Sequence, residues 1–173
     1  MPALLLDQVE IYVFRRRHGR VEFLALKRSE AAALPGVWQP ITGRLRRGES
    51  ALGAARREVR EETGFVPKRW WSLEAPTIYF DARSDAVVAL PLFAAEVGAA
   101  EAVILSKEHG EARFVSARQA GKLYLWNAQR RGLEAVRRQV LDAGPLARAL
   151  AIAVPRAQRP RHVARGRDPR RRT

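Results

Sequence analysis

The segment from residue 43 to residue 65, GRLRRGESALGAARREVREETGF, constrains the fold of this chain more than any other stretch. Ser50 is a favoured N-cap residue, and Gly64 stands where a left-handed C-terminal cap is wanted. The residues between them favour a helix, and only Gly53 weakens it. The sequence therefore predicts a helix over 51–62, in the middle of the segment.

Several glutamates lie on one face of this predicted helix. Positions i, i+3 and i+4 stack on one another, so Glu58, Glu61 and Glu62 share one edge. A neighbouring apolar stripe that includes Ala55 and Val59 can be buried, which leaves the acids at the rim of a cleft.

Helix stability alone does not favour these acids. Like charges at this spacing repel by roughly a few tenths of a kcal/mol per pair, and the helix dipole disfavours anions at the C-terminal end. A hard divalent cation removes both penalties, and oxygen ligands with no cysteine or histidine nearby favour Mg²⁺ or Mn²⁺ over zinc. The alternative is a solvated surface helix whose acids are neutralised by Arg56, Arg57 and Arg60.

The spacing of the segment matches every fixed position of the Nudix box, the signature of the Nudix hydrolases. Five residues separate Gly43 from Glu49, seven more precede Arg57 and Glu58, and the box closes with two further glutamates, Gly64 and an apolar residue. The resemblance implies a loop–helix–loop packed on a mixed sheet. It covers about residues 6–143.

The resemblance also implies roles for the residues of the box. Glu58 and Glu62 are expected to bind metal ions, Glu61 to act as a further ligand or as the base, and the Gly43 carbonyl to add another oxygen. The positions expected to be structural are Glu49, Arg57 and Gly64. Glu49 is also a candidate ligand for a second metal.

A second acidic group lies far along the chain, in SKEHGEARFV at 106–115. It resembles the Glu-His pair that precedes a strand in the Nudix subgroup of dihydroneopterin triphosphate and nucleoside triphosphate pyrophosphohydrolases. Glu108 matches the glutamate of that subgroup that reaches the metal cluster and can serve as base. A solvated surface loop is the alternative interpretation.

Two further stretches, GVWQPITG and LWNAQRRGLEAV, are similar to the same subgroup. They imply that Trp38 and Gln39 contact substrate, and that Trp38 or Trp126 stacks on a base or pterin. Core packing is the competing interpretation for both rings and is favoured for Trp126. Arg28 and Arg44 are candidates for binding phosphates.

Apolar and β-branched runs predict the remaining elements, beginning with a hairpin of 8–14 and 21–27. Further strands are expected at 41–43, 70–80, 85–97, 102–105 and 112–115. Helices are expected at 116–123, 127–143 and 146–154. Pro91 predicts that the strand containing it lies at a sheet edge or is bulged. Because strands and helices interleave irregularly, the expected fold class is α/β (α+β), a Nudix-like α/β/α sandwich around a mixed sheet.

The 173 residues suit one domain, assigned to 1–154, followed by a basic tail at 155–173. The tail has eight arginines, one aspartate and three prolines, which predicts disorder and weak, non-specific contact with nucleic acid. The chain has no cysteine, signal-peptide pattern or membrane-length apolar run. These features predict a cytoplasmic protein without a membrane partner.

The expected reaction is Mg²⁺-dependent hydrolysis of a (deoxy)nucleoside triphosphate or dihydroneopterin triphosphate to the monophosphate and pyrophosphate. Within the same chemistry, the alternative is a pyrophosphohydrolase acting on dinucleoside polyphosphates or RNA 5′ ends. From another class, the alternative is a nucleotide-sensing Nudix module without catalysis, although no glutamate of the box is lost here.

Overall fold

A long hairpin forms the centre of the main sheet in the computed structural model, which describes residues 1–142 and 144–153. Its strands, β2 (Gln8–Arg17) and β3 (Arg20–Arg28), pair antiparallel from Phe14 and Phe23 to the turn. His18 and Gly19 make that turn with positive φ. The hairpin predicted from the apolar runs is confirmed.

The two hairpin strands separate at their other ends, and two short strands occupy the opening. β4 (Trp38–Gln39) pairs with β3, and β5 (Ile41–Arg44) pairs with β2. The chain therefore turns at Pro40 inside the sheet, and β4 and β5 diverge from this turn. This opening positions the site, because β5 leads directly into the segment that precedes the acidic helix.

The main sheet is mixed. β9 (Leu92–Val97) runs parallel to β2, whereas the other pairs are antiparallel. Beyond β9 the sheet continues with β6 (Arg69–Ser72) and then β11 (Ala151–Ile152). Beyond β3 it ends with β10 (His109–Val115). The smaller sheet has the order β1 (Ala3–Leu5), β8 (Ala86–Leu90), β7 (Thr77–Asp81).

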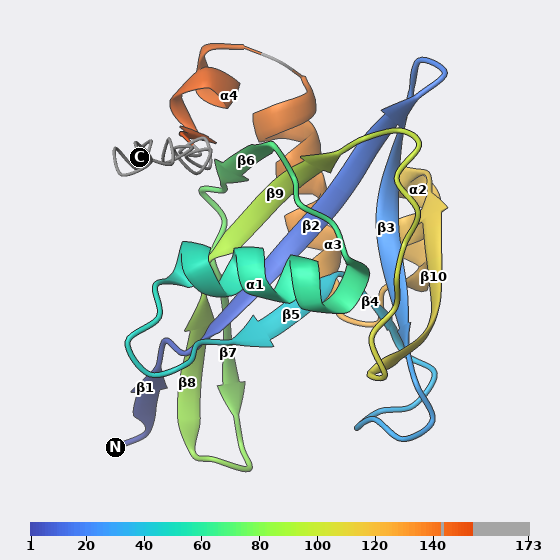
Figure 1. Cartoon of the computed structure of the whole chain (residues 1–173). Coiled ribbons are helices and arrows are strands. Elements are labelled where there is room, and N and C mark those ends of the chain that lie inside the picture. The colour runs from blue at the N-terminus through green and yellow to red at the C-terminus, as the bar shows by residue number, and fades with distance from the viewer. Residues whose placement is uncertain (143, 154–173) are drawn as a thin grey trace, which may run out of the picture.

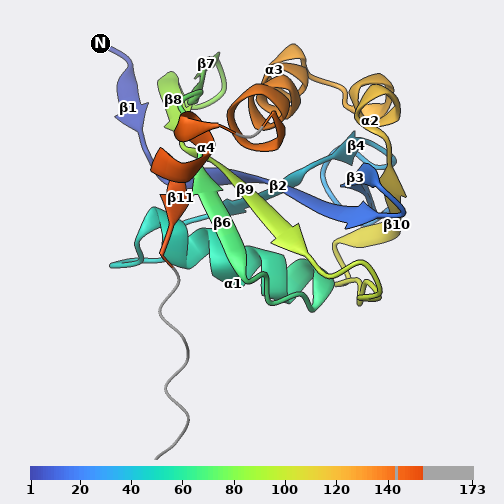
Figure 2. The ribbon, with the colours of Figure 1, turned by 90° about the horizontal axis from the view of Figure 1, so that it is seen from above.

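Helices cover both faces of the main sheet, as Figures 1 and 2 show. α1 (Ala51–Thr63) covers one face; α2 (Ala117–Leu123) and α3 (Asn127–Val136) cover the other. α3 continues into a π-helical turn, η1 (Arg137–Leu141), and α4 (Pro145–Ala149) precedes β11. Alternation along β2 separates two cores: Val9 and Ile11 pack on the α1 side, and Tyr12 and Phe14 on the other. The predicted α/β/α sandwich is confirmed.

Two of the predicted strands are divided in the structure. The run 70–80 forms β6 and β7 in different sheets, with Pro76 between them. At Pro91 the run 85–97 passes from β8 in the small sheet to β9 in the main sheet, where β9 lies between β2 and β6. The chain breaks at this proline as expected, but the strand after it is not at an edge.

Three other predictions need correction. Residues 102–105 form no strand, because backbone groups here bond to the end of α1. The helix predicted over 127–143 is α3 followed by η1, and it ends at Leu141. The helix predicted over 146–154 is α4 followed by β11, which pairs with β6. Residues 143, 154 and the tail 155–173 lie outside the described residues. Within the described ranges, no helix is long and apolar enough to cross a bilayer.

Candidate active site

Local capping fixes both ends of the acidic helix α1. Ser50 is extended and its Oγ accepts a hydrogen bond from the Gly53 N–H at 3.1 Å. Gly64 has φ 74°, the left-handed conformation that glycine adopts at low cost, and its N–H donates to the Arg60 carbonyl. The helix therefore begins and ends where the sequence predicts, to within one residue.

Glu49 and Arg57 form a two-bond ion pair that holds the loop before α1 against the helix. Nε and Nη2 of Arg57 donate to the two carboxylate oxygens of Glu49 at 2.9 and 2.8 Å, and Nη2 also donates to the Arg44 carbonyl at 2.8 Å. Hydrogen bonding by Arg57 lowers the pKa of Glu49 to about 2. The contacts are those of a brace between loop and helix.

The same guanidinium holds two acids of the helix. Nη1 of Arg57 donates to Glu58 at 2.6 Å and to Glu61 at 3.1 Å, and Arg46 adds a second partner for Glu61 at 3.0 Å. The side chain of Glu58 lies against Gly43 so closely that a Cβ on that glycine would overlap it. Gly43 is therefore the point at which β5 touches the acidic edge of α1.

Glu62 differs from Glu58 and Glu61 because no arginine among the described residues bonds to it. Its side chain is buried, and Oε2 lacks a hydrogen-bond partner within the same part of the chain. Nδ1 of buried His109 lies 3.8 Å from this oxygen. Burial first, and then the charges of Glu58 and Glu108, raise the pKa of Glu62 to about 9. Burial also lowers the pKa of His109, so the imidazole is a poor source of compensating charge.

Glu108 is brought to this edge by backbone bonds to two elements. The Ser106 N–H donates to the Glu62 carbonyl at 3.3 Å, which ties the segment to the end of α1. The Glu108 carbonyl accepts from the Ser29 N–H at 2.9 Å, which ties it to the end of β3. Its charge contributes to raising the pKa of both Glu58 and Glu62. The two acidic groups that the sequence singled out therefore lie in one region.

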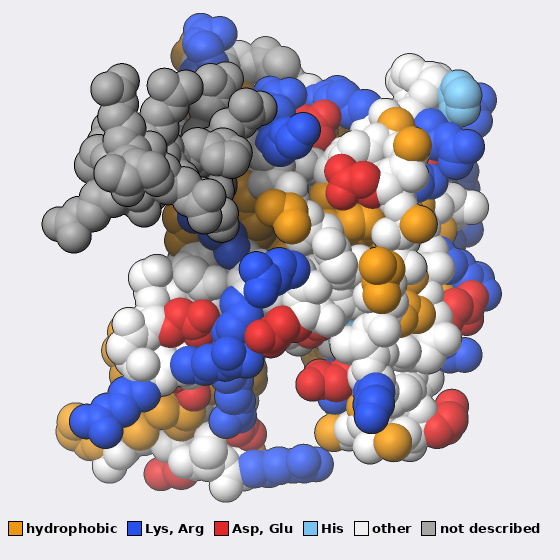
Figure 3. All heavy atoms as spheres, in the orientation of Figure 1, with side chains coloured by type: hydrophobic (Ala, Val, Ile, Leu, Met, Phe, Trp, Pro, Cys, Tyr) orange, Lys and Arg blue, Asp and Glu red, His pale blue; other side chains and the backbone are white. Residues whose placement is uncertain are grey.

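A hollow opens next to this region. Figure 3 shows it below α1, between the β7–β8 hairpin and the segment that follows β3, with acidic and basic side chains at its rim. Arg28, at the end of β3, is near enough for its charge to lower the pKa of Glu62. Its Nε donates to the Ala33 carbonyl. Arg44, at the outer end of β5, is exposed.

The acids fit a divalent cation in chemistry, although they do not form a ready cage. Within 1–142 and 144–153, no group of three or more His, Asp or Glu side chains is arranged to hold a metal. Glu58 and Glu61 pair with Arg57 instead. Buried Glu62 has an oxygen without a hydrogen-bond partner among the described residues, and the charge of Arg28 only partly offsets its burial and its acidic neighbours. Carboxylate oxygens of this kind suit Mg²⁺ or Mn²⁺.

Trp38 and Gln39, the two residues of β4, have different surroundings. The ring of Trp38 is half-buried against the core on the α2–α3 side, and the Arg113 guanidinium lies 4.8 Å from its centroid. Gln39 is buried, and its amide lies 3.5 Å from the hydroxyl of Thr42, to which it donates. Gln39 and Thr42 line the same pocket, and Trp38 is not among its lining residues.

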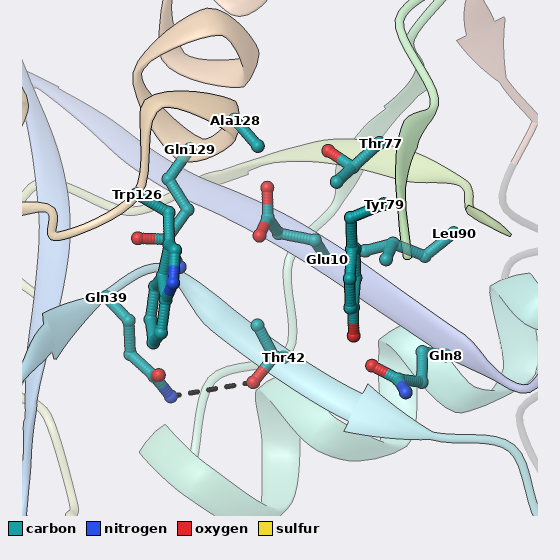
Figure 4. A pocket seen from close by; sticks show the side chains of 10 residues that line it. All are labelled: Gln8, Glu10, Gln39, Thr42, Thr77, Tyr79, Leu90, Trp126, Ala128 and Gln129. Carbon is teal, nitrogen blue, oxygen red and sulfur yellow. Dashed lines mark hydrogen bonds between the residues drawn. The ribbon is translucent and has the colours of Figure 1, made fainter. Parts of the chain in front are cut away.

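That pocket, of about 340 Å³, lies between the main sheet and the start of α3. Figure 4 shows the rings of Trp126 and Tyr79 on opposite sides of it, with the carboxyl group of Glu10 between them. Both rings are partly exposed, at 41% and 43%. Glu10 is 4% exposed, and its neighbour Gln129 is also buried.

Sequence interpretation did not identify Glu10, Tyr79 or Gln129 as site residues and favoured core packing for Trp126. One signal was available: Glu10 is a single acid within the apolar run of β2. A buried carboxyl in such a run needs a partner or a function. Tyr79 gives no such signal, because an aromatic residue in a strand is ordinary.

Comparison with known proteins agrees with the geometry. The family model described as NUDIX domain matches residues 6–136. No curated protein matches the chain. A solved structure assigned as a NUDIX hydrolase from Listeria monocytogenes is 26% identical, with TM-score 0.67, over 79% of this chain and 94% of that one.

Two other solved structures share the fold at lower identity. The C. elegans Ap4A hydrolase has TM-score 0.68 and 21% identity, over 80% of this chain and 100% of that one. The E. coli dihydroneopterin triphosphate pyrophosphohydrolase has TM-score 0.63 and 18% identity, over 80% and 99%. Together with the family match and the intact box on α1, these likenesses show that the chain belongs to the Nudix family and is a hydrolase of phosphoanhydrides.

Proposed function

We propose that this protein is a Mg²⁺-dependent pyrophosphohydrolase that converts a nucleoside or pterin triphosphate into the monophosphate and pyrophosphate. The observation that carries the proposal is Glu62, a buried carboxyl with an unpartnered oxygen beside Glu58 and Glu108. A buried acid in this setting is costly unless a cation accompanies it. Mn²⁺ suits the same oxygen ligands.

The metal would be held by acids from two elements. Glu58 and Glu62 supply carboxylates from α1, Glu108 supplies one from the segment before β10, and Gly43 offers its carbonyl. Bound magnesium neutralises charge on phosphoryl oxygens and acidifies water. Glu61 is a further ligand or the base, and Glu108 is the other candidate for the base.

Arg57 sets the starting geometry of these acids. Because its guanidinium contacts Glu49, Glu58 and Glu61 together, it holds the last two carboxylates at the acidic edge of α1. A bound cation would compete with Arg57 for Glu58. The Glu49 contact would then keep the guanidinium at the loop.

The substrate would span the opening of the sheet. On β5, Thr42 lines the pocket, whereas the next residue, Gly43, faces Glu58 on the other side of the sheet. A heterocycle between Trp126 and Tyr79 can therefore send its phosphates past the divergence of β4 and β5 toward the acids. Arg28 would bind phosphate, and the effect of its charge on the nearby Glu62 supports this role. Arg44 is at the rim of the same opening.

The reaction has a simple balance. A water oxygen bonds to phosphorus and the bridging P–O bond of the anhydride breaks. The bridging oxygen stays with pyrophosphate if the α-phosphorus is attacked, and with the monophosphate if the β-phosphorus is attacked. The water proton passes to the carboxylate that acts as base. In oxygen-18 water, the labelled product identifies the phosphorus attacked.

The test is turnover by the purified protein with nucleoside and dihydroneopterin triphosphates and added Mg²⁺. We expect Glu62→Gln to lower kcat by roughly 10²–10³-fold, the size seen when one charge-stabilising group is lost. Exposed Glu74→Gln is the matched control and should behave as wild type. Binding of Mn²⁺, followed by electron paramagnetic resonance, should weaken in Glu62→Gln but not in the control. Wild-type turnover by Glu62→Gln would reject the metal role.

A further inference from the structure

The pocket on the α3 side places an acid where a ligand would lie. Of the described residues that line it, Glu10 is the only acidic one, and none is a lysine or arginine. This is unusual in a chain with a net charge of +14. Burial raises the pKa of Glu10 to about 7, against hydrogen bonds from Tyr12 and Gln129 that lower it. These hydrogen bonds therefore offset the burial of the carboxyl group only in part.

The hydrogen bonds around Glu10 show which partners are missing. The Tyr12 hydroxyl is within reach of both the Glu10 carboxylate and the Gln129 carbonyl, 2.9 Å away. One hydroxyl proton can serve only one of these two acceptors. An ionised carboxylate accepts up to about four hydrogen bonds, so Glu10 retains capacity for N–H donors from a ligand.

The pocket walls indicate the shape of that ligand. Trp126 and Tyr79 face one another across the space, and Glu10 lies between them on the sheet side (Figure 4). A flat heterocycle stacked between the rings would turn one edge toward the carboxylate. The amides of Gln39 and Gln129 lie beside the same space and can donate to a ring carbonyl.

The rings of common nucleotides differ in what they offer to a carboxylate. Guanine and pterin share a 2-amino-4-oxopyrimidine edge, in which a ring N–H and an amino group are adjacent donors. Adenine presents a ring nitrogen acceptor at that place, and hypoxanthine has the N–H without the amino group. Uracil and thymine flank their single N–H with carbonyl oxygens, which a carboxylate repels.

We propose that Glu10 is the specificity-determining residue of this pocket and selects a heterocycle with the 2-amino-4-oxopyrimidine edge, as in guanine or pterin. This inference rests on the proposed function, because the pocket would hold the ring of the triphosphate that the acids on the other face hydrolyse. Glu10 positions and selects the ring and takes no part in bond breaking. Gln39 and Gln129 would donate to the ring carbonyl.

The test compares GTP, ITP, ATP and dihydroneopterin triphosphate with the full-length protein and Mg²⁺. Wild type should prefer GTP or dihydroneopterin triphosphate over ATP, with ITP between them because it lacks the amino group. Glu10→Gln should lower kcat/KM for the preferred substrate by about 10–100-fold, the range for one bidentate contact, mainly through KM. The kcat/KM values for ITP and ATP should fall by a smaller factor. The two preferred substrates distinguish a guanine pocket from a pterin pocket.

Equilibrium binding separates this inference from the proposed reaction. Guanosine and adenosine triphosphate analogues with an α,β-methylene bridge bind without P–O–P cleavage at that position. If wild type binds the guanosine analogue selectively and Glu10→Gln does not, the inference holds even without turnover. Glu22→Gln, outside the pocket, is the control for general effects of removing a carboxylate.

Two results would overturn the inference. One is wild-type protein that shows no preference for GTP or dihydroneopterin triphosphate over ATP, a measurement that does not depend on any variant folding. The other is an equal loss on all four substrates in a Glu10→Gln protein with a cooperative thermal unfolding transition.

Discussion

Arg57 is the residue on which most contacts of the acidic region depend. It meets Glu49 through two nitrogens, reaches Glu58 and Glu61 with a third, and caps the Arg44 carbonyl. Only a planar guanidinium offers this many donors in a fixed fork. Lysine in the same place has a single ammonium group, which can make only some of these hydrogen bonds.

Replacing Arg57 by lysine should therefore disturb the acids without removing the positive charge. We expect Arg57→Lys to lower kcat/KM by roughly 10–100-fold, as for other partners that orient metal ligands. Exposed Arg60→Lys, on the same helix, is the matched control. Steady-state rates at saturating and limiting Mg²⁺ measure the effect, and equal rates for the two variants would contradict it.

Glu10 links the stability of the protein to pH. Its pKa is about 7 in the folded state against 4.5 ordinarily, because burial disfavours the charged form. Between these values the folded state binds more protons than the unfolded state, so the free energy of unfolding falls as pH rises. The stabilisation is complete below pH 4.5 and is lost by the time pH passes 7.

Glu10→Gln should remove this pH dependence, since glutamine does not titrate. The free energy of unfolding of the variant relative to wild type should rise by about 3 kcal/mol from pH 4 to pH 8, which is the pKa difference converted to energy. Urea unfolding at a series of pH values with EDTA present measures it. A difference between Glu10→Gln and wild type that stays constant with pH would contradict the prediction.

At the scale of elements, α3 approaches β2 closely enough that only glycine fits at one position. A Cβ on Gly132 would overlap the Tyr12 hydroxyl, which donates to the Gln129 carbonyl at the start of α3. Trp126 immediately precedes this helix as its N-cap residue. The approach of α3 to the sheet thus sets one wall of the pocket.

Gly132→Ala should push α3 away from β2. We expect a loss of about 1–3 kcal/mol in the free energy of unfolding, typical of overpacking, and a raised KM because Trp126 moves with the helix. Gly121→Ala on α2 is the matched control, because its Cβ would meet nothing closer than Leu133 at 3.9 Å. There the gain in helix propensity should leave stability equal or higher. Equal stability of both variants would show that α3 can shift without cost.

The segment before β10 illustrates which elements local sequence can predict. Val103 and Ile104 have the composition of a strand, yet the Ile104 N–H donates to the Thr63 carbonyl at the end of α1. A helix terminus far earlier in the chain thus satisfies this backbone N–H, and no neighbouring strand is needed. A pattern of apolar residues carries no information about such a distant partner.

For the whole molecule, half of the net charge lies in the last nineteen residues of the sequence. Residues 155–173 carry eight arginines and one aspartate, a net +7 of the total +14. We expect that a chain ending at residue 154 keeps its kcat/KM for small triphosphates. Its affinity for single-stranded RNA should depend less on salt, with a log–log slope smaller by up to about five, since each phosphate contact contributes about 0.7. Fluorescence anisotropy from low to high salt measures this, and equal slopes would assign RNA contact to the domain.

The sequence by itself determined α1, its caps, the hairpin and the acidic box. All of these depend on neighbours within a few residues or on fixed spacing: Ser50 and Gly64 act on the helix they flank, and Glu58, Glu61 and Glu62 share a face because of helical periodicity. Only the tertiary structure decided that Glu108 lies beside Glu62, and that Glu10, Tyr79 and Trp126 form one pocket. These residues come from segments far apart in the chain. Backbone hydrogen bonds that join the segment before β10 to Glu62 and to Ser29 bring Glu108 to the acids, and the packing of α3 on the sheet sets one wall of the pocket.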